Sequence, residues 1–357
     1  MTAVRIAGCG LACSLGLSVA DCVAALSAGG RAPESRVLPG GLGGKFPYHA
    51  IPLTCAGWHE RARDLVTRVA AEAGAGEARY GALLIATSSF DIGAIAPAEA
   101  AGYEGDYRRF VDRVAGWLDW KGPVYAISTA CTSSLNAMLV ANSLLRAGAV
   151  GDALVLGIEL GNPLTLGSFA ALQLLSRNAC RPFGAGRDGL VLGESVVAVR
   201  QAAGGQSGWR LLGGANVVDG SQPTGASATA LDAMYRQALA DSGLAAHDVD
   251  LIKVQAAGSP GNDEAEALAL RAAFAHVPPL VSLKPAIGHT MGASGAAEVA
   301  LLLGCLDSNA WPACPWPIDP GLGVTLATVA PTEVRRVLAT ILGFGGSHAS
   351  VVLEKAP

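Results

Sequence analysis

The sequence predicts an α/β fold whose β-sheets are covered by helices on both faces. One observation is the alternation along the chain of short apolar runs, typical of buried strands, with longer segments of helical periodicity. The other is composition: of 357 residues, 51% are hydrophobic and 15% are charged, which is enough apolar material for a large core. We therefore expect one domain, or two closely packed domains, without extensive disorder.

The expected strands and helices alternate from the first third of the chain onwards. Residues 124–127, Val-Tyr-Ala-Ile, predict a short buried strand, and apolar side chains at helical spacing follow from Leu135 to Leu145 until Gly148 ends the helix. The further expected strands cover residues 153–158, 191–199 and 251–254. The further expected helices cover residues 228–240 and 264–275.

Cys131 lies between the first of these strands and the helix that follows it. A cysteine at such a turn faces free backbone N–H groups and the positive end of the helix dipole, which favour the thiolate and lower the thiol pKa. This position predicts a nucleophilic thiol. The turn by itself is equally compatible with a cysteine that acts as a small buried apolar residue.

Charge and cysteine content exclude several classes of protein. A formal net charge of -4 argues against a nucleic-acid surface. The eight cysteines form no dense framework and no Cys-x-x-Cys pair, so we expect a reducing, cytoplasmic location. We also expect neither an export signal nor a membrane span, because no sustained apolar stretch is long enough.

Two weaker motifs have ordinary explanations. Residues 184–189 match Gly-x-Gly-x-x-Gly, but a strand is expected after them where a dinucleotide site needs a helix. Cys9 and Cys13, taken with His49 or His59, match no compact zinc site. We therefore expect neither a dinucleotide cofactor nor a metal.

Three further segments complete a pattern with the cysteine turn. Residues 176–194 contain Cys-Arg-Pro-Phe and Gly-Arg-Asp-Gly, residues 282–295 contain Lys284 and His289 five positions apart, and residues 342–348 form a glycine-rich turn. In this order the four segments resemble the β-ketoacyl-acyl-carrier-protein synthase family, the condensing enzymes of fatty-acid and polyketide synthesis. The resemblance runs from an opening strand at residues 4–11 to a closing strand at 350–353, and weakens between about residues 30 and 120.

The resemblance implies the thiolase-like fold, in which two similar halves form a five-layer αβαβα sandwich. The first half would comprise residues 1–205 and carry Cys131, and the second would comprise residues 206–357 and carry Lys284 and His289. In this fold the helices that begin near Thr132 and Thr290 lie at the centre.

The resemblance also implies a site. Cys131 would be the nucleophile that accepts an acyl group from the phosphopantetheine arm of an acyl carrier protein, with no other cofactor. His289 would be the second histidine of the site, and Lys284 the lysine that orders it. The backbone amides of Cys131 and Phe344 would form the oxyanion hole.

The sequence departs from the family at the first histidine. Ala257 occupies that position, although Asp263 and Glu266 keep the acidic spacing after it. Losing one donor at a developing oxyanion costs roughly 3 to 4 kcal/mol, or 100 to 1,000-fold in rate. Gln255 is a weak candidate replacement, since in a strand it would face the same side as Ala257.

Three other positions bear on substrate binding. Ser259 offers the one hydroxyl left from a pair of threonines that binds pantetheine in the family. Leu342 stands where the family often has a gatekeeping phenylalanine, and His348 replaces an asparagine. His348 is expected to be a structural residue rather than a relocated acid-base group.

Three functions fit these residues. The first is a non-elongating partner, similar to a chain-length factor, that pairs with a complete ketosynthase. The second is an acyltransferase or non-elongating ketosynthase that loads acyl groups on Cys131. The third is an elongating enzyme in which another residue or a partner subunit replaces the missing histidine. All three imply an acyl carrier protein as partner and a homodimer or heterodimer, and we rank them in this order.

Overall fold

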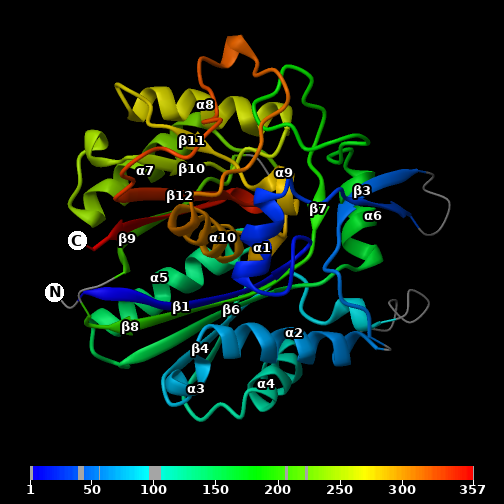
Figure 1. Ribbon diagram of the computed structural model, residues 1–357, viewed down its shortest axis with the longest axis vertical. Helices are drawn as coiled ribbons and strands as arrows, with labels where there is room; N and C mark the ends of the chain where they lie inside the picture. The colour runs from blue at the N-terminus through cyan, green and yellow to red at the C-terminus, as the bar shows by residue number, and fades with distance from the viewer. Residues whose placement is uncertain are drawn as a thin grey trace.

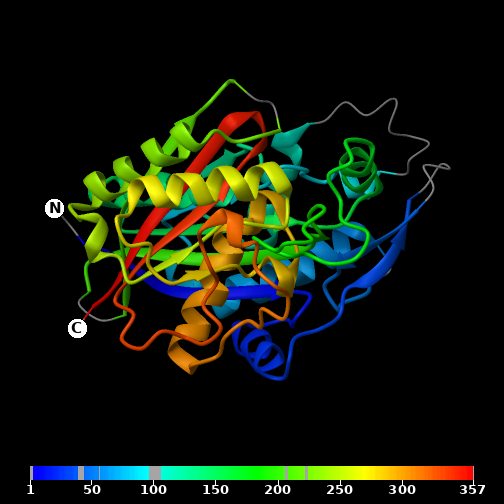
Figure 2. The ribbon, with the colours of Figure 1, turned by 90° about the horizontal axis from the view of Figure 1, so that it is seen from above.

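The protein is arranged in five alternating layers of helices and sheet (Figure 1). The computed structural model describes residues 3–38, 44–55, 57–95, 106–205, 208–221 and 224–356. One outer layer contains α2 (Trp58–Glu72), α3 (Ala75–Ala78) and α4 (Tyr107–Trp117). The central layer contains α1 (Val19–Ser27), α5 (Ser133–Arg146) and α10 (Ser294–Ser308). The other outer layer contains α7 (Ala228–Ser242) and α8 (Pro260–Ala273), which lie side by side over the sheet (Figure 2).

In the described part of the chain the main sheet has ten strands, which form two sections with the same order. The first section reads β5 (Val124–Ile127), β4 (Ala82–Ala86), β6 (Asp152–Glu159), β8 (Ser195–Ala203) and β1 (Val4–Cys13). The second reads β11 (Leu280–Val281), β10 (Leu251–Lys253), β12 (Arg336–Leu342), β13 (Ser347–Lys355) and β9 (Trp209–Val218). Numbered within its section, each order is 3-2-4-5-1. This repetition is the internal symmetry expected of a thiolase-like fold.

The two sections are joined edge to edge. Strands β1 and β9 pair only at Val4 with Leu211 and at Arg5 with Arg210 before they diverge. A separate small sheet contains β2 (Glu34–Val37), β3 (Lys45–His49) and β7 (Leu192–Gly193). The proposed boundary near residue 205 lies beside Gln206 and Ser207, which are outside the described residues, so the division into two halves stays a prediction.

The two central helices correspond to each other in the two sections. Each connects the third strand of its section to the fourth, α5 between β5 and β6, and α10 between β11 and β12. Small residues let them approach closely: a Cβ at Gly295 would overlap the Leu135 side chain. The structure therefore confirms the central position predicted for the helices that begin near Thr132 and Thr290.

Most elements predicted from the periodicity are confirmed. Two predictions were wrong: residues 124–127 form strand β5 but are half-buried or exposed and not buried, and residues 191–199 do not form a single strand, because β7 ends at Gly193 and β8 begins at Ser195. Between them, the Glu194 carboxylate pairs with Arg61 at 2.6 Å and accepts hydrogen bonds from the amides of Ile51 and Gly161. A buried carboxylate needs such partners. The strand is interrupted at Glu194, where its carboxylate reaches them.

The helices in the described part of the chain are short or only moderately apolar. None of its helices combines the length and the apolar character that crossing a bilayer requires.

Candidate functional site

Cys131 stands directly before α5, on a turn that hydroxyl groups fix in place. Ala130 has a φ of 53°, in the left-handed region that non-glycine residues rarely adopt. The Thr132 hydroxyl donates to the Thr129 carbonyl at 2.6 Å, and the Ser133 hydroxyl donates to the Ala130 carbonyl at 2.6 Å. The strained backbone therefore presents Cys131 at the helix N-terminus, as the sequence predicts.

His289 contacts the thiol directly. Its Nε2 lies 3.0 Å from the Cys131 Sγ, and its Nδ1 lies 3.1 Å from the Ser294 hydroxyl. Its backbone N–H donates to the Val191 carbonyl at 2.7 Å, and its carbonyl accepts from the Gly193 N–H at 3.0 Å. The thiol and the imidazole, only 5% and 3% exposed, thus form a buried pair with a fixed orientation.

Burial governs the electrostatics of this pair. It raises the pKa of Cys131 to about 11, although the Phe344 amide and the positive charge of Lys284 oppose this shift. Burial, followed by the charges of Lys284 and Lys253, places the pKa of His289 well below its usual value. Burial therefore favours a neutral imidazole and a protonated thiol. The prediction of a lowered thiol pKa was wrong, because desolvation outweighs the helix terminus.

Both amides of the predicted oxyanion hole face the sulfur. The backbone amides of Phe344 and Cys131 both act to lower the pKa of the Cys131 thiol. The glycine-rich turn places Phe344 there, with Gly345 and Gly346 both at a φ of 76°. The Thr132 and Ser347 hydroxyl groups, 2.9 Å apart, connect the two ends of this arrangement. The two amides therefore lie beside the sulfur, and their role as an oxyanion hole stays a prediction.

Lys284 lies behind the pair in a buried ionic cluster. Its Nζ pairs with Oε1 of Glu298 on α10. The second oxygen, Oε2, pairs at 2.9 Å with the Nζ of Lys253, which also donates to the Thr340 carbonyl at 2.5 Å. All three charged side chains are fully buried. Lys284 is predictable from the sequence, whereas Lys253 is not, because its surroundings in β10 indicate only a strand.

The position of the missing histidine adjoins a very small cavity. The cavity measures about 20 Å³, room for about one water molecule. Its walls include Cys131, His289, Leu190, Gln255, Ala256, Ala257, Ser259, Asn262, Asp263, Glu266, Leu342 and Phe344. The structure therefore brings together the predicted thiol, second histidine, oxyanion amide and substrate-binding residues around one space.

The two acidic residues after Ala257 accept hydrogen bonds from backbone amides of its loop. Asp263 accepts from the amides of Ala257 and Gly258, both at 3.1 Å, and from Phe183 at 2.8 Å. Glu266 accepts from the amides of Gln255 and Ala256 at 2.8 and 2.7 Å. Burial raises the pKa of Asp263 to about 6 and that of Glu266 to about 7. The two acids therefore hold the backbone of this loop in place.

Gln255 and His348, two other residues considered from the sequence, lie in different places. Gln255 lines the small cavity with 8% of its surface exposed, and its side-chain oxygen has no partner among the described residues. His348 is fully buried on β13, and neither ring nitrogen has a partner in the described structure. His348 does not line the cavity, so the structure does not bring it to the thiol.

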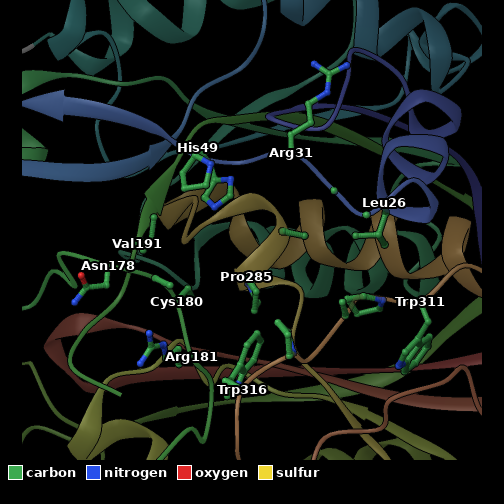
Figure 3. A pocket seen from close by; sticks show the side chains of 18 of the residues that line it. Leu26, Arg31, His49, Asn178, Cys180, Arg181, Val191, Pro285, Trp311 and Trp316 are labelled. Atoms are coloured by element: carbon green, nitrogen blue, oxygen red, sulfur yellow. The ribbon is translucent and has the colours of Figure 1, made fainter. Parts of the chain in front are cut away.

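A larger cleft of about 760 Å³ lies elsewhere, and neither Cys131 nor His289 is among its lining residues. The side chains of His49, Pro285, Trp311 and Trp316 line it (Figure 3). Cys180 forms part of its wall and donates to the Ala257 carbonyl at 3.1 Å. The thiol chemistry is therefore enclosed in the smaller space. No group of three or more metal-ligating side chains occurs within the described ranges.

The chain matches the models of two protein-family domains. The family model "Beta-ketoacyl synthase, N-terminal domain" matches residues 55–200, and "Beta-ketoacyl synthase, C-terminal domain" matches residues 211–315. The spectinabilin polyketide synthase system protein NorA' of Streptomyces orinoci is 33% identical over 74% of this chain. The 3-oxoacyl-[acyl-carrier-protein] synthase 2 of Coxiella burnetii is 30% identical over 66% of it. The matches span 8% and 63% of the lengths of these two relatives.

A solved structure extends the likeness over the whole fold. The structure of the ketosynthase ApeO in complex with its chain length factor ApeC, from Xenorhabdus doucetiae, matches with a TM-score of 0.83 and 24% identity. The match covers 99% of this chain and 98% of that chain. At this identity the likeness shows the fold, and it confirms the predicted thiolase-like architecture.

Proposed function

Because the chain belongs to the β-ketoacyl synthase family, we propose that it is a non-elongating subunit, similar to a chain-length factor, that pairs with a complete ketosynthase. The observation that supports this most is Ala257 beside a cavity with room for one water molecule. A methyl group offers no hydrogen bond to the enolate formed when a malonyl thioester loses carbon dioxide. Decarboxylative condensation by this chain alone is then slower by about 100 to 1,000-fold.

The free edge of the sheet supports pairing with a second subunit. Strand β5 is the last strand of its section and, in the described part of the chain, pairs only with β4. Tyr125 on this strand is 40% exposed, and Ala126 beside it is also exposed. An unpaired edge with an exposed aromatic residue favours addition of another strand. We infer a dimer through β5, with a ketosynthase or with a second copy.

A second candidate function is acyl transfer to Cys131, favoured by the 3.0 Å contact between its sulfur and His289. The neutral imidazole takes the thiol proton, and the sulfur attacks the carbonyl of an acyl thioester on a carrier protein. The amides of Cys131 and Phe344 stabilise the tetrahedral oxyanion. The pantetheine thiolate then leaves and recovers the proton from His289. Ser259, on the cavity wall, is the hydroxyl available to the pantetheine arm.

Three measurements separate these functions. Incubation with acyl carrier proteins, followed by intact mass measurement, shows whether Cys131 gains an acyl group. Release of carbon dioxide from malonyl carrier protein reports elongation, and a near-normal rate for the chain alone would refute the non-elongating role. The third measurement is copurification with a complete ketosynthase. If the chain copurifies, changes the product length and shows no acyl mass shift, the result supports the role of a non-elongating partner subunit.

A further inference from the structure

Lys253 is unusual for its place in the fold. It is the last residue of β10, the strand Leu251–Lys253, and it has no exposed surface. A buried ammonium group loses its hydration and needs close partners in return. Its partners are the Glu298 carboxylate at 2.9 Å and the Thr340 carbonyl at 2.5 Å. One of these, Glu298, is also the partner of Lys284.

The cluster therefore contains more positive than negative charge. Two ammonium groups share the single carboxylate of Glu298. Glu266 on α8 also acts on Lys253, and burial raises the pKa of its carboxyl to about 7, which disfavours its ionised form. Glu159, on strand β6 of the first section, carries a negative charge that raises the pKa of the Cys131 thiol. The charge of Glu298 cannot neutralise both lysines.

This uncompensated charge acts on the thiol site. Lys284 favours ionisation of the Cys131 thiol, and both lysines disfavour protonation of His289. We propose that Lys253 is a positioning residue of the thiol site: by taking one oxygen of Glu298 it leaves the charge of Lys284 incompletely neutralised, and this charge stabilises the thiolate of Cys131. The inference deepens the proposed function, because it concerns the reactivity of the same thiol.

Alkylation by iodoacetamide, an uncharged reagent, tests the proposal. The background is His289→Asn, because the imidazole would respond to the same charge in the opposite sense. In this background we compare Lys253→Met with the intact lysine and follow modification of the Cys131 peptide by mass spectrometry. Lys121→Met is the matched control, since Lys121 is an exposed lysine paired with Asp119 at the surface.

The expected result is a rate difference that depends on pH. At pH 7, removal of Lys253 slows alkylation of Cys131 by roughly tenfold, equivalent to a pKa change of about one unit. Because burial lowers the pKa of Lys253 to about 8, its charge is present below that pH and is lost above it. The ratio of the two rates should therefore approach one as the pH rises past 8, and the control should keep the rate of its background throughout.

Equal rates at pH 7 would overturn the proposal. A ratio that is the same at every pH would also overturn it, because a purely structural role of Lys253 gives that result. If Lys253→Met does not fold, Lys253→Gln keeps an amide donor without the charge, and the same two criteria decide. The reaction needs no carrier protein and no partner subunit, so its outcome is independent of whether the chain pairs with a ketosynthase.

Discussion

The part of the site on the central helices differs from the part on the outer loop. Cys131 lies just before α5 and His289 precedes α10, and the thiol and the imidazole contact each other. The loop before α8 has a methyl group at Ala257, while Asp263 and Glu266 in the first turns of α8 still accept hydrogen bonds from its amides. The difference shows that the segment from Ala257 to Glu266 combines a structural role with a chemical role, and that the two can be separated. Acids that satisfy buried amides remain necessary for folding, whereas an imidazole is necessary only for chemistry.

Cys131→Ala tests the central part and should have the largest effect. Without the sulfur no thioester forms, so the acyl mass shift should disappear completely. The measurement is intact mass after incubation with acyl carrier protein. Cys314→Ala, at a partly exposed cysteine outside the site, is the control and should keep the shift. An acylated Cys131→Ala protein would place the acceptor elsewhere.

Asp263→Ala tests the outer part through stability. The change leaves the amides of Ala257, Gly258 and Phe183 without their acceptor, and each unsatisfied buried donor costs about 1 to 3 kcal/mol. The free energy of unfolding should therefore fall by at least about 3 kcal/mol, measured by urea denaturation. Asp112→Ala, on the exposed face of α4, should change it by less than about 0.5 kcal/mol. Equal stability of the two variants would show that Asp263 does not hold the loop.

The lowered pKa of Lys253 predicts a pH dependence of stability. Its pKa is about 8 in the folded protein and near 10.5 when unfolded, so the unfolded state binds more protons between these values. Stability therefore gains a contribution as the pH rises from 8 to 10.5, up to about 3 kcal/mol for one proton. Lys253→Met should lack this contribution, and the difference in unfolding free energy between the two proteins should change with pH in this window. A constant difference would contradict the lowered pKa.

Ala257→His is the most direct comparison of the two parts and should have the smallest effect. The adjoining cavity has room for about one water molecule, so an imidazole overpacks it and costs about 1 to 3 kcal/mol of stability. We expect carbon dioxide release from malonyl carrier protein to stay near that of the wild type. A rise of 100-fold or more would show that the loop accepts a histidine in working geometry. Ala257→Ser, a small polar change, serves as the packing control.

The residues that assemble in the candidate site were largely predictable from sequence. The order of four motifs placed Cys131, Lys284, His289 and Phe344 in one site, and the structure brings them together. Lys253 was not predictable, because a lysine in an apolar strand gives no sign of the carboxylate it meets 45 positions later, on α10. The failure at residues 191–199 has the same origin, since local periodicity does not show the partners of Glu194.

The sequence by itself determined the alternation of strands and helices, the cysteine at a strand-to-helix turn and the absence of a histidine at position 257. These are properties of local pattern and residue identity. Only the tertiary structure decided the protonation of the thiol, the size of the cavity beside Ala257 and the sharing of Glu298 by two lysines. Each of these depends on how completely water is removed and on which charges meet across distant segments, and neither quantity is local in the chain.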